Sequence, residues 1–253
     1  MQLTPFMFVI VCPMLFLAGF VDAIGGGGGL ISLPAYLLAG LPIHSAIATN
    51  KLSSSCGTAL ATGRFIRKGL VNFRIAVPSV IAAILGASLG AQLSLAVSET
   101  VMKYILLGIL PLATFFVLNR HLFQDEGKHA AEADRKTLAV CTAFAFIIGM
   151  YDGFYGPGTG TFLIIAFTVF ARMTVGSANA HAKVINLTAN VTSLTVYLLN
   201  GQVLFLLGLA AAACNMAGSW VGSGLAITKG TKIVRPVIIL VLLLLLAKII
   251  FNF

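Results

Sequence analysis

Long apolar stretches follow one another along almost the whole chain, and they limit the fold more than any other feature. Runs near residues 74–95, 101–119, 137–151, 203–227 and 233–253 approach or reach the roughly 20 residues that a helix needs to cross a bilayer. The runs are continuous rather than alternating, which favours helices over a closed barrel, the only other structure that lipid tolerates. Only 9% of the 253 residues are charged, against about 25% in soluble domains. We therefore predict an all-α integral membrane protein.

The basic residues and the cysteines indicate no nucleic-acid partner and no metal. The net charge of +9 comes from Lys and Arg in short connections between the apolar runs, where membrane proteins concentrate them. We therefore expect a lipid bilayer as partner and no nucleic acid. The four cysteines fall in apolar segments and form no C-x-x-C pair, so we expect neither a metal site nor a disulfide framework. They are Cys12, Cys56, Cys141 and Cys214.

A self-comparison of the sequence shows a duplication. A shift of 130 residues aligns Gly19, Asp22, Gly26 and Gly28 with Gly149, Asp152, Gly156 and Gly158, and a shift of 132 aligns Lys51, Gly69, Val71, Gly86 and Gly90 with Lys183, Gly201, Val203, Gly218 and Gly222. We predict a first membrane repeat over residues 1–119, a charged cytoplasmic linker over 120–136 and a second membrane repeat over 137–253.

The two repeats are predicted to have opposite orientations, because their matched loops differ in charge. In the first repeat, residues 64–74 contain four basic residues and the next loop contains only Lys103. In the second repeat the order is reversed, since residues 198–204 contain none and residues 228–235 contain three. Lys and Arg collect on the cytoplasmic side, so equivalent loops face opposite sides. The result is an inverted-repeat helical bundle, which is typical of secondary transporters whose site lies where the repeats meet.

A run of five glycines interrupts the first repeat, in the stretch GFVDAIGGGGGLISLP at residues 19–34, and YGPGTG at residues 155–160 interrupts the second. The apolar segment after the first break, LISLPAYLLAG, measures roughly 16 Å as a helix, about half of a 30 Å hydrocarbon core. It cannot cross alone, so we predict two glycine-broken re-entrant hairpins. Non-helical backbone at that depth must be covered by protein or line a water-filled cavity.

The glycine breaks are candidate anion sites. Glycine accepts a positive φ and lets a ligand approach the backbone, and the helix that follows presents free N–H groups and the positive end of its dipole. The candidate positions are Gly27, Gly28, Gly158 and Thr159. Close helix packing is the alternative reason for the glycines, whereas a nucleotide loop is disfavoured because no G-K-[ST] follows either break.

Two polar helices, near residues 45–67 and 179–199, each carry a lysine inside a membrane segment. A charge in such a place indicates function by default. Helical spacing puts Lys51 and Ser54 on one face, and it does the same for Lys183, Asn186 and Asn190. Together with Asn50, these residues are candidate ligands for a tetrahedral oxyanion, which they would hold through charge-assisted hydrogen bonds.

Asp22 and Asp152 each precede a glycine break. Either one can pair with Lys51 or Lys183 as an internal salt bridge, and such pairing is compatible with binding if the substrate displaces it. The aspartates are either titratable coupling groups or braces of the turn, and we favour braces because glycine turns leave many backbone donors to satisfy. His181 fits a hydrogen-bonded packing residue better than a proton relay.

Three stretches resemble the sulfite exporter TauE/SafE family of bacterial membrane transporters. They are AGFVDAIGGGGGLISLPAYLLAGLPIHSAIATNKL, IGMYDGFYGPGTGTFL and ANAHAKVIN, and the resemblance extends over nearly the whole chain. It implies a multi-pass protein of the bacterial inner membrane with about eight membrane segments. It also implies transport of sulfur-containing oxyanions, small organic sulfonates or carboxylates, without a cofactor. The exact substrate, the coupling ion and the presence of a homo-oligomer stay open.

The prediction is therefore a secondary transporter that moves small anions by alternating access. Export is the default direction, because a negative-inside potential drives a monoanion outward by about 2.3 kcal/mol per 100 mV. An intramembrane enzyme, suggested by His181 and the serines at 53–55, is disfavoured because neither G-x-S-x-G nor H-E-x-x-H occurs. A non-transporting scaffold is the third hypothesis, and it would require a dry, filled interior.

Overall fold

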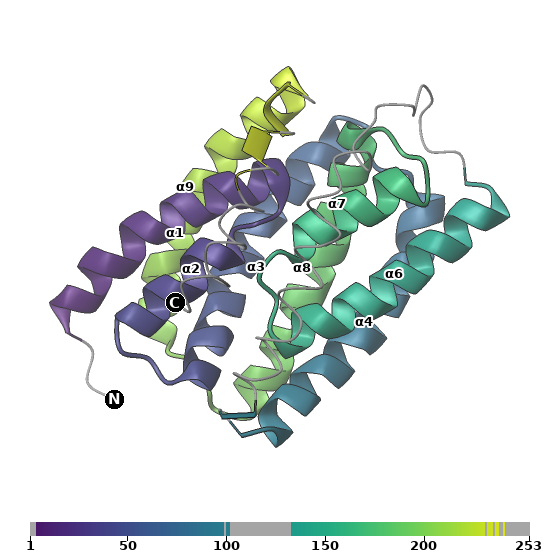
Figure 1. Cartoon of the computed structure of the whole chain (residues 1–253). Coiled ribbons are helices and arrows are strands. Elements are labelled where there is room, and N and C mark those ends of the chain that lie inside the picture. The colour runs from purple at the N-terminus through teal and green to yellow at the C-terminus, as the bar shows by residue number, and fades with distance from the viewer. Residues whose placement is uncertain are drawn as a thin grey trace.

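The computed structural model describes residues 4–98, 100–101, 133–230, 232–234, 236–237 and 240, and the account below concerns these residues. They form helices and no β-strand (Figure 1). Most of the predicted linker 120–136 and of the apolar runs 101–119 and 233–253 lies outside the described residues. The helices are α1 Pro5–Gly25, α2 Gly29–Leu38, α3 Ile43–Arg67, α4 Phe73–Ala96, α6 Arg135–Phe154, α7 Thr159–Val169, α8 Val175–Leu199 and α9 Phe205–Lys229.

The described helices fall into three classes by length and polarity. Four of them, α1, α4, α6 and α9, are long and apolar enough to cross a membrane. Helices α3 and α8 have 25 residues each and bury many polar side chains, whereas α2 and α7 have only 10 and 11 residues. The series α1 to α4 and the series α6 to α9 start at matched positions, with offsets of 130 for the first two helices and 132 for the last two. The prediction of an all-α membrane protein is confirmed.

Local sequence sets several helix ends. Helix α1 ends at Gly26, which takes φ 81° and donates its amide to the Asp22 carbonyl, an end that glycine favours. The side chains of Asn72, Asp134 and Thr174 accept hydrogen bonds from the first turns of α4, α6 and α8. At the start of α6, hydrogen bonds from the hydroxyl and amide groups of the first turn hold the pKa of the exposed Asp134 carboxyl below its usual value.

The helices sort into two bundles, which are visible side by side in Figure 1. Bundle one contains α1, α2, α3 and α9, and bundle two contains α4, α6, α7 and α8. Each bundle therefore holds three helices from one half of the sequence and the last helix from the other half. Helix α9 packs against α1 and α3, and α4 packs against α6 and α8. The bundles meet mainly where α3 contacts α8, with smaller contacts of α1 with α7 and α8.

Small residues let the exchanged helices pack closely. A Cβ atom on Gly86 would lie 2.2 Å from the carbonyl oxygen of Phe146, and one on Gly90 would lie 2.0 Å from that of Met150. The contacts between α1 and α9 are similar, because a Cβ atom on Gly218 would lie 1.9 Å from a carbonyl oxygen of α1. In both pairs the contact positions rise together along the two helices, so the helices run parallel.

Helices α3 and α8 run in opposite directions. The Leu204 amide, before α9, donates to the Thr49 hydroxyl near the start of α3 at 3.1 Å, and the Asn72 amide, before α4, donates to the His181 ring near the start of α8 at 3.1 Å. Since α9 directly follows α8 and α4 directly follows α3, each polar helix ends where the other begins. Pairs α1/α2 and α6/α7 fold back on themselves between these ends. Their depth in a bilayer stays a prediction.

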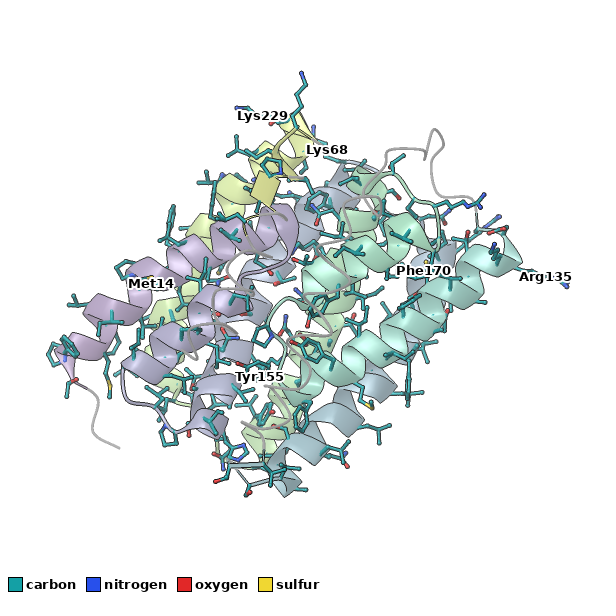
Figure 2. All side chains as sticks on the ribbon, in the orientation of Figure 1. Met14, Lys68, Arg135, Tyr155, Phe170 and Lys229 are labelled. Atoms are coloured by element: carbon teal, nitrogen blue, oxygen red, sulfur yellow. The ribbon has the colours of Figure 1, made fainter. Side chains whose placement is uncertain are left out.

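The directions of the helices bring the basic residues to one end of the molecule. At this end α3 and α9 finish, and α4, α6 and α8 begin. Lys68, Arg135 and Lys229 mark it in Figure 2. Among the described residues, every Lys and Arg except Lys51 and Lys183 belongs to this end. The set is Arg64, Arg67, Lys68, Arg74, Arg135, Lys136, Arg172, Lys229 and Lys232.

The close approach of α4 to α6 makes a stability prediction. Gly90→Ala places a methyl group against the backbone of α6, and overpacking of this kind costs about 1–3 kcal/mol. Gly63→Ala is the matched control, because a Cβ atom at that helical glycine meets nothing within 4 Å, and alanine is the better helix former by up to about 1 kcal/mol. Thermal unfolding in detergent should show a lower midpoint for Gly90→Ala alone. Equal midpoints would contradict the packing described here.

Candidate functional site

The two glycine breaks cross at the centre of the molecule. Gly26 and Gly156 occupy equivalent positions and take positive φ values of 81° and 99°, which glycine adopts without strain. The breaks also touch, since a Cβ atom on Gly26 would lie 2.3 Å from the carbonyl carbon of Gly160. Next to this contact, the Thr161 hydroxyl donates to the Gly25 carbonyl at 2.6 Å. Glycine therefore serves both the turn and the close packing, the two reasons that the sequence left open.

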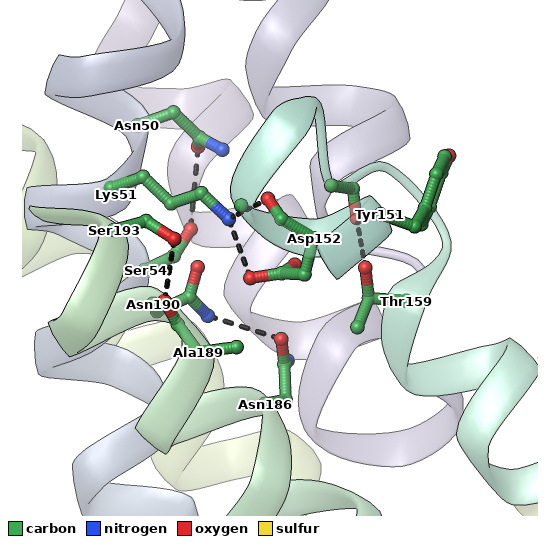
Figure 3. A network of polar contacts seen from close by, with 12 residues as sticks. Asn50, Lys51, Ser54, Tyr151, Asp152, Thr159, Asn186, Ala189, Asn190 and Ser193 are labelled. Carbon is green, nitrogen blue, oxygen red and sulfur yellow. Dashed lines mark hydrogen bonds and ion pairs between the residues drawn. The ribbon is translucent and has the colours of Figure 1, made fainter. Parts of the chain in front are cut away.

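Each buried lysine pairs with the aspartate of the other repeat. Lys51 Nζ donates to Asp152 Oδ2 and to the Asp152 carbonyl, both at 2.6 Å (Figure 3). Lys183 Nζ donates to Asp22 Oδ2 at 2.9 Å and also to the Asp22 carbonyl. The lysine side chains are 2% and 0% exposed, so neither reaches water by extending its stem. The salt-bridge arrangement considered from the sequence is therefore present, and it is crosswise.

Both ion pairs also connect the two bundles. Lys51 lies on α3 of bundle one and Asp152 on α6 of bundle two, while Lys183 lies on α8 of bundle two and Asp22 on α1 of bundle one. A buried lysine without its carboxylate is an uncompensated charge, which costs far more than an exposed one. The two pairs therefore hold the bundles together at the crossing of the glycine breaks.

A cavity of about 20 Å³ lies between the bundles at this crossing. It is large enough for about one water molecule and too small for an oxyanion, but it is not sealed, since the side chain of Asp22 in its wall is 16% exposed. Its polar wall comes from the last turns of α1 and α6 with the breaks that follow them, the starts of α2 and α7, and helices α3 and α8. The lining residues are Asp22, Gly26, Gly29, Asn50, Lys51, Ser54, Asp152, Gly156, Thr159, Gly160, Asn186 and Asn190.

The structure brings most of the predicted site residues to this cavity. Lys51, Asn50, Ser54, Asn186, Asn190, Thr159 and both aspartates line it. Five predicted residues do not: Lys183 lies behind Asp22, His181 lies near the start of α4, and Gly27, Gly28 and Gly158 belong to the breaks without lining the cavity. Whether any of them binds substrate stays a prediction.

Asp22 also contributes to the turn that follows it. Asp22 Oδ1 accepts the Gly28 amide at 3.4 Å, a long hydrogen bond, and its carbonyl accepts the Gly26 amide at 2.8 Å. His181 has a comparable bracing geometry, because its Nδ1 contacts the Ser177 carbonyl at 2.8 Å while its Nε2 accepts the Asn72 amide. These contacts fit the packing role expected for His181.

Sequence reasoning missed four lining glycines, Gly26, Gly29, Gly156 and Gly160. The amides of Gly29 and Gly160 donate to no backbone or side-chain acceptor in the part of the chain that the structure describes. The duplication matched Gly26 with Gly156, but it also matched Gly28 with Gly158, which do not line the cavity, so it did not single out the lining pair. Gly160 has Leu30 at the matched position, so the duplication could not identify it either.

A family model described as Sulfite exporter TauE/SafE matches residues 11–249. The chain belongs to this family. Among its relatives, the probable membrane transporter protein ORF9 of Sinorhizobium sp is 38% identical over 95% of this chain and 89% of its own length. The probable membrane transporter protein YfcA of Escherichia coli K12 is 32% identical over 99% of this chain and 92% of its own length.

A probable membrane transporter protein of Haemophilus influenzae is 34% identical over 94% of this TauE/SafE chain and 92% of its own length. No solved structure matches the chain with significance. The family and these relatives indicate a multi-pass membrane transporter, and the resemblance seen in the sequence is confirmed.

The crosswise ion pairs make a second stability prediction. Lys51→Ala leaves the Asp152 carboxylate buried and unpaired, which should lower the free energy of unfolding by about 3–5 kcal/mol. Lys51→Met combined with Asp152→Asn removes both charges and should recover much of that loss. Thermal and denaturant unfolding in detergent measure the difference. If the single and double variants are equally destabilised, the ion pair is not what holds the site.

Proposed function

We propose that this TauE/SafE protein is a secondary transporter of the bacterial inner membrane, which moves small sulfur-containing oxyanions such as sulfite or organosulfonates, or related organic anions, by alternating access. The observation that carries the proposal is the small polar cavity between two bundles, with a buried lysine in its wall and a second one directly behind. Intramembrane charges of this kind mark substrate pathways.

The chemistry of the wall favours an anion. Lys51 supplies a charged donor, and the lining residues Gly29 and Gly160 supply amides at the starts of α2 and α7, where the positive ends of the helix dipoles add to the attraction. Asn50 and Asn186 already use their carbonyl oxygens to accept hydrogen bonds from Ser54 at 3.3 Å and from Asn190 at 3.1 Å. Their NH₂ groups are therefore the remaining donors.

Alternating access follows from the two-bundle construction. The cavity is too small for an oxyanion in this state, so a substrate can bind only after the bundles separate, and rocking of one bundle against the other about a fixed site is the usual solution. The contacts that must change are few, because the bundles meet mainly through α3 and α8. The two lysine–aspartate pairs lie at that interface and would open when an anion replaces a carboxylate.

The clustering of basic residues supports one orientation. Short cytoplasmic connections concentrate Lys and Arg, so the end marked by Lys68, Arg135 and Lys229 would face the cytoplasm. We propose no enzymatic activity: His181, which motivated an enzyme hypothesis, contacts Ser177 and Asn72 outside the cavity, and the relatives are named as transporters.

Transport by reconstituted protein tests the site. Proteoliposomes loaded with sulfite or an organosulfonate should release it at a rate that falls about tenfold to a hundredfold in Lys51→Ala and in Lys183→Ala, because a lost hydrogen bond from a charged donor costs about 1.5–3 kcal/mol. Lys68→Ala, an exposed lysine at the end of α3, is the matched control and should keep the parental rate. Parental rates in correctly folded Lys51 and Lys183 variants would refute the proposed site.

Labelling tests the orientation. Lys68→Cys and Asn200→Cys place single exposed thiols at opposite ends of the polar helices. A membrane-impermeant maleimide added to intact spheroplasts should label only the Asn200 variant, and inverted vesicles should reverse the result. The parent protein reports the background from its four native cysteines. Labelling of both variants from one side would overturn the topology.

A further inference from the structure

The charges around the cavity balance to zero. Lys51 and Lys183 contribute two positive charges and Asp22 and Asp152 two negative ones, and the lysines bond directly to the aspartates. In the described residues the charged groups facing Asp22 are Lys183 from α8, with Asp152 and Lys51 across the cavity. The other elements around the cavity, α2 and α7, contribute glycines and Thr159, none of which titrates.

An anion that enters a balanced cluster leaves it with a net negative charge. Such a charge is unfavourable in a buried site within a membrane protein, where solvation by water is lost. The lysines are also already occupied, so the anion must compete with carboxylates that are held at 2.6 Å and 2.9 Å. Protonation of one aspartate solves both problems, because it frees a lysine and gives the cluster a charge of plus one.

We propose that anion and proton are loaded together, one proton for each negative charge of the anion, and that Asp22 takes the first proton. This inference rests on the proposed transport function and adds its coupling ion. The step is a proton transfer from a hydronium ion of the solvent to the Asp22 carboxylate, which leaves a water molecule and a neutral carboxylic acid, while Lys183 turns from that carboxylate to the anion. The loaded site is neutral again for a monoanion.

The two ion pairs differ in a way that selects Asp22. Both aspartates line the cavity, but the Asp22 side chain is 16% exposed and the Asp152 side chain only 2%. Among the described residues, the Oδ1 atom of Asp22 accepts only a long bond of 3.4 Å from the Gly28 amide. Each aspartate binds its lysine through both its carboxylate and its carbonyl, but the carboxylate contact is 2.9 Å long at Asp22 and 2.6 Å at Asp152. A proton reaches Asp22 more readily and breaks a weaker arrangement there.

Coupling of this kind changes the energetics of transport. With a proton bound, the site that carries a monoanion is neutral, so the membrane potential does no work on its movement. Direction then depends on the concentration gradients of the anion and the proton together. A closed, ion-paired empty state would complete the cycle, since it too carries no net charge across the membrane.

The test measures protons taken up when an anion binds to purified, detergent-solubilised protein. Methanesulfonate is the monoanion probe and sulfate the dianion probe, because neither changes charge between about pH 6 and 9, unlike sulfite. Titration in buffers of different ionisation enthalpy should show uptake of about one proton per methanesulfonate and two per sulfate. Because one proton is taken up with each anion, the dissociation constant of methanesulfonate should rise about tenfold per pH unit wherever the carboxylate is ionised in the free protein.

Variants locate the proton. Asp22→Asn fixes the charge of the loaded state, so methanesulfonate should bind without proton uptake and without the loss of affinity at high pH. A purely structural role for Asp22 predicts weaker binding with the pH dependence retained. Asp152→Asn raises the net charge of the cluster by one, just as Asp22→Asn does. Double variants that keep the cluster neutral therefore show which of the two aspartates takes the proton. Lys51→Met with Asp152→Asn should bind methanesulfonate more weakly but keep the proton uptake and the pH dependence, and Lys183→Met with Asp22→Asn should lose the proton uptake and the pH dependence.

The outcomes distinguish this inference from the proposed function. Wild-type protein that binds neither these probes nor sulfite at any pH would contradict the anion site itself. Binding without proton uptake in the wild type would overturn the coupling and leave the anion site standing. Retention of pH-coupled binding in the Lys183→Met and Asp22→Asn double variant would move the proton away from Asp22. Because the wild-type measurement needs no variant, poor folding of a mutant leaves the proposal falsifiable.

Discussion

The rest of the structure depends on two buried lysines, Lys51 and Lys183, which have no access to water. Each must have a carboxylate and further acceptors at hydrogen-bond distance, because an unpaired ammonium group in this environment is too costly. The required carboxylate has to sit deep in the protein beside a backbone that offers its own carbonyl. Ending α1 and α6 at glycine breaks provides both groups at once, since Lys183 and Lys51 each bind the side chain and the carbonyl of one aspartate. The glycine breaks therefore meet the requirement that the buried lysines impose, namely a carboxylate and a carbonyl at hydrogen-bond distance.

The crosswise pairing explains why the breaks must touch. For Lys51 to reach Asp152 and Lys183 to reach Asp22, the two breaks have to cross at the pseudo-symmetric centre, where Gly26 and Gly160 leave no room for a side chain. The same pairing links bundle one to bundle two. A change at this single place, such as the loss of one carboxylate charge, thus acts on the turn, the ion pair and the bundle interface together. Few other positions in the described chain have that reach.

Much of the arrangement was predictable because the duplication carries it. The offsets of 130 and 132 matched equivalent helices, and the lengths after the breaks foretold that α2 and α7 would be too short to cross a bilayer alone. Buried lysines at matched places and an aspartate before each break were enough to suggest an internal salt bridge. These features are local, and they depend on residue type and spacing.

The partners of each helix were not predictable in the same way. The exchange of α4 and α9 between the bundles depends on shape along whole helix faces, where Gly86 and Gly90 meet the backbone of α6, and small residues on a helix do not say which helix they will meet. The choice of Asp152 for Lys51 and Asp22 for Lys183 follows from that crossing. The sequence also could not show that Asp22 lies between Lys183 and the cavity. Helical spacing placed both lysines on equally polar faces, so nothing indicated that only Lys51 would line the cavity.

The two halves of the site are related but not identical, and this asymmetry bears on how the site can work. Ser54 of α3 corresponds to Asn186 of α8, and Gly29 corresponds to Thr159, so the walls of the cavity offer different donors. The unequal exposure of Asp22 and Asp152, 16% against 2%, extends the difference to the ion pairs. A strictly symmetric pair would compete equally for a proton and for an anion, and either half could open. Under the proposed mechanism, this difference gives opening an order, in which the shorter Lys51–Asp152 pair holds the bundles while the more exposed Asp22 exchanges its lysine first.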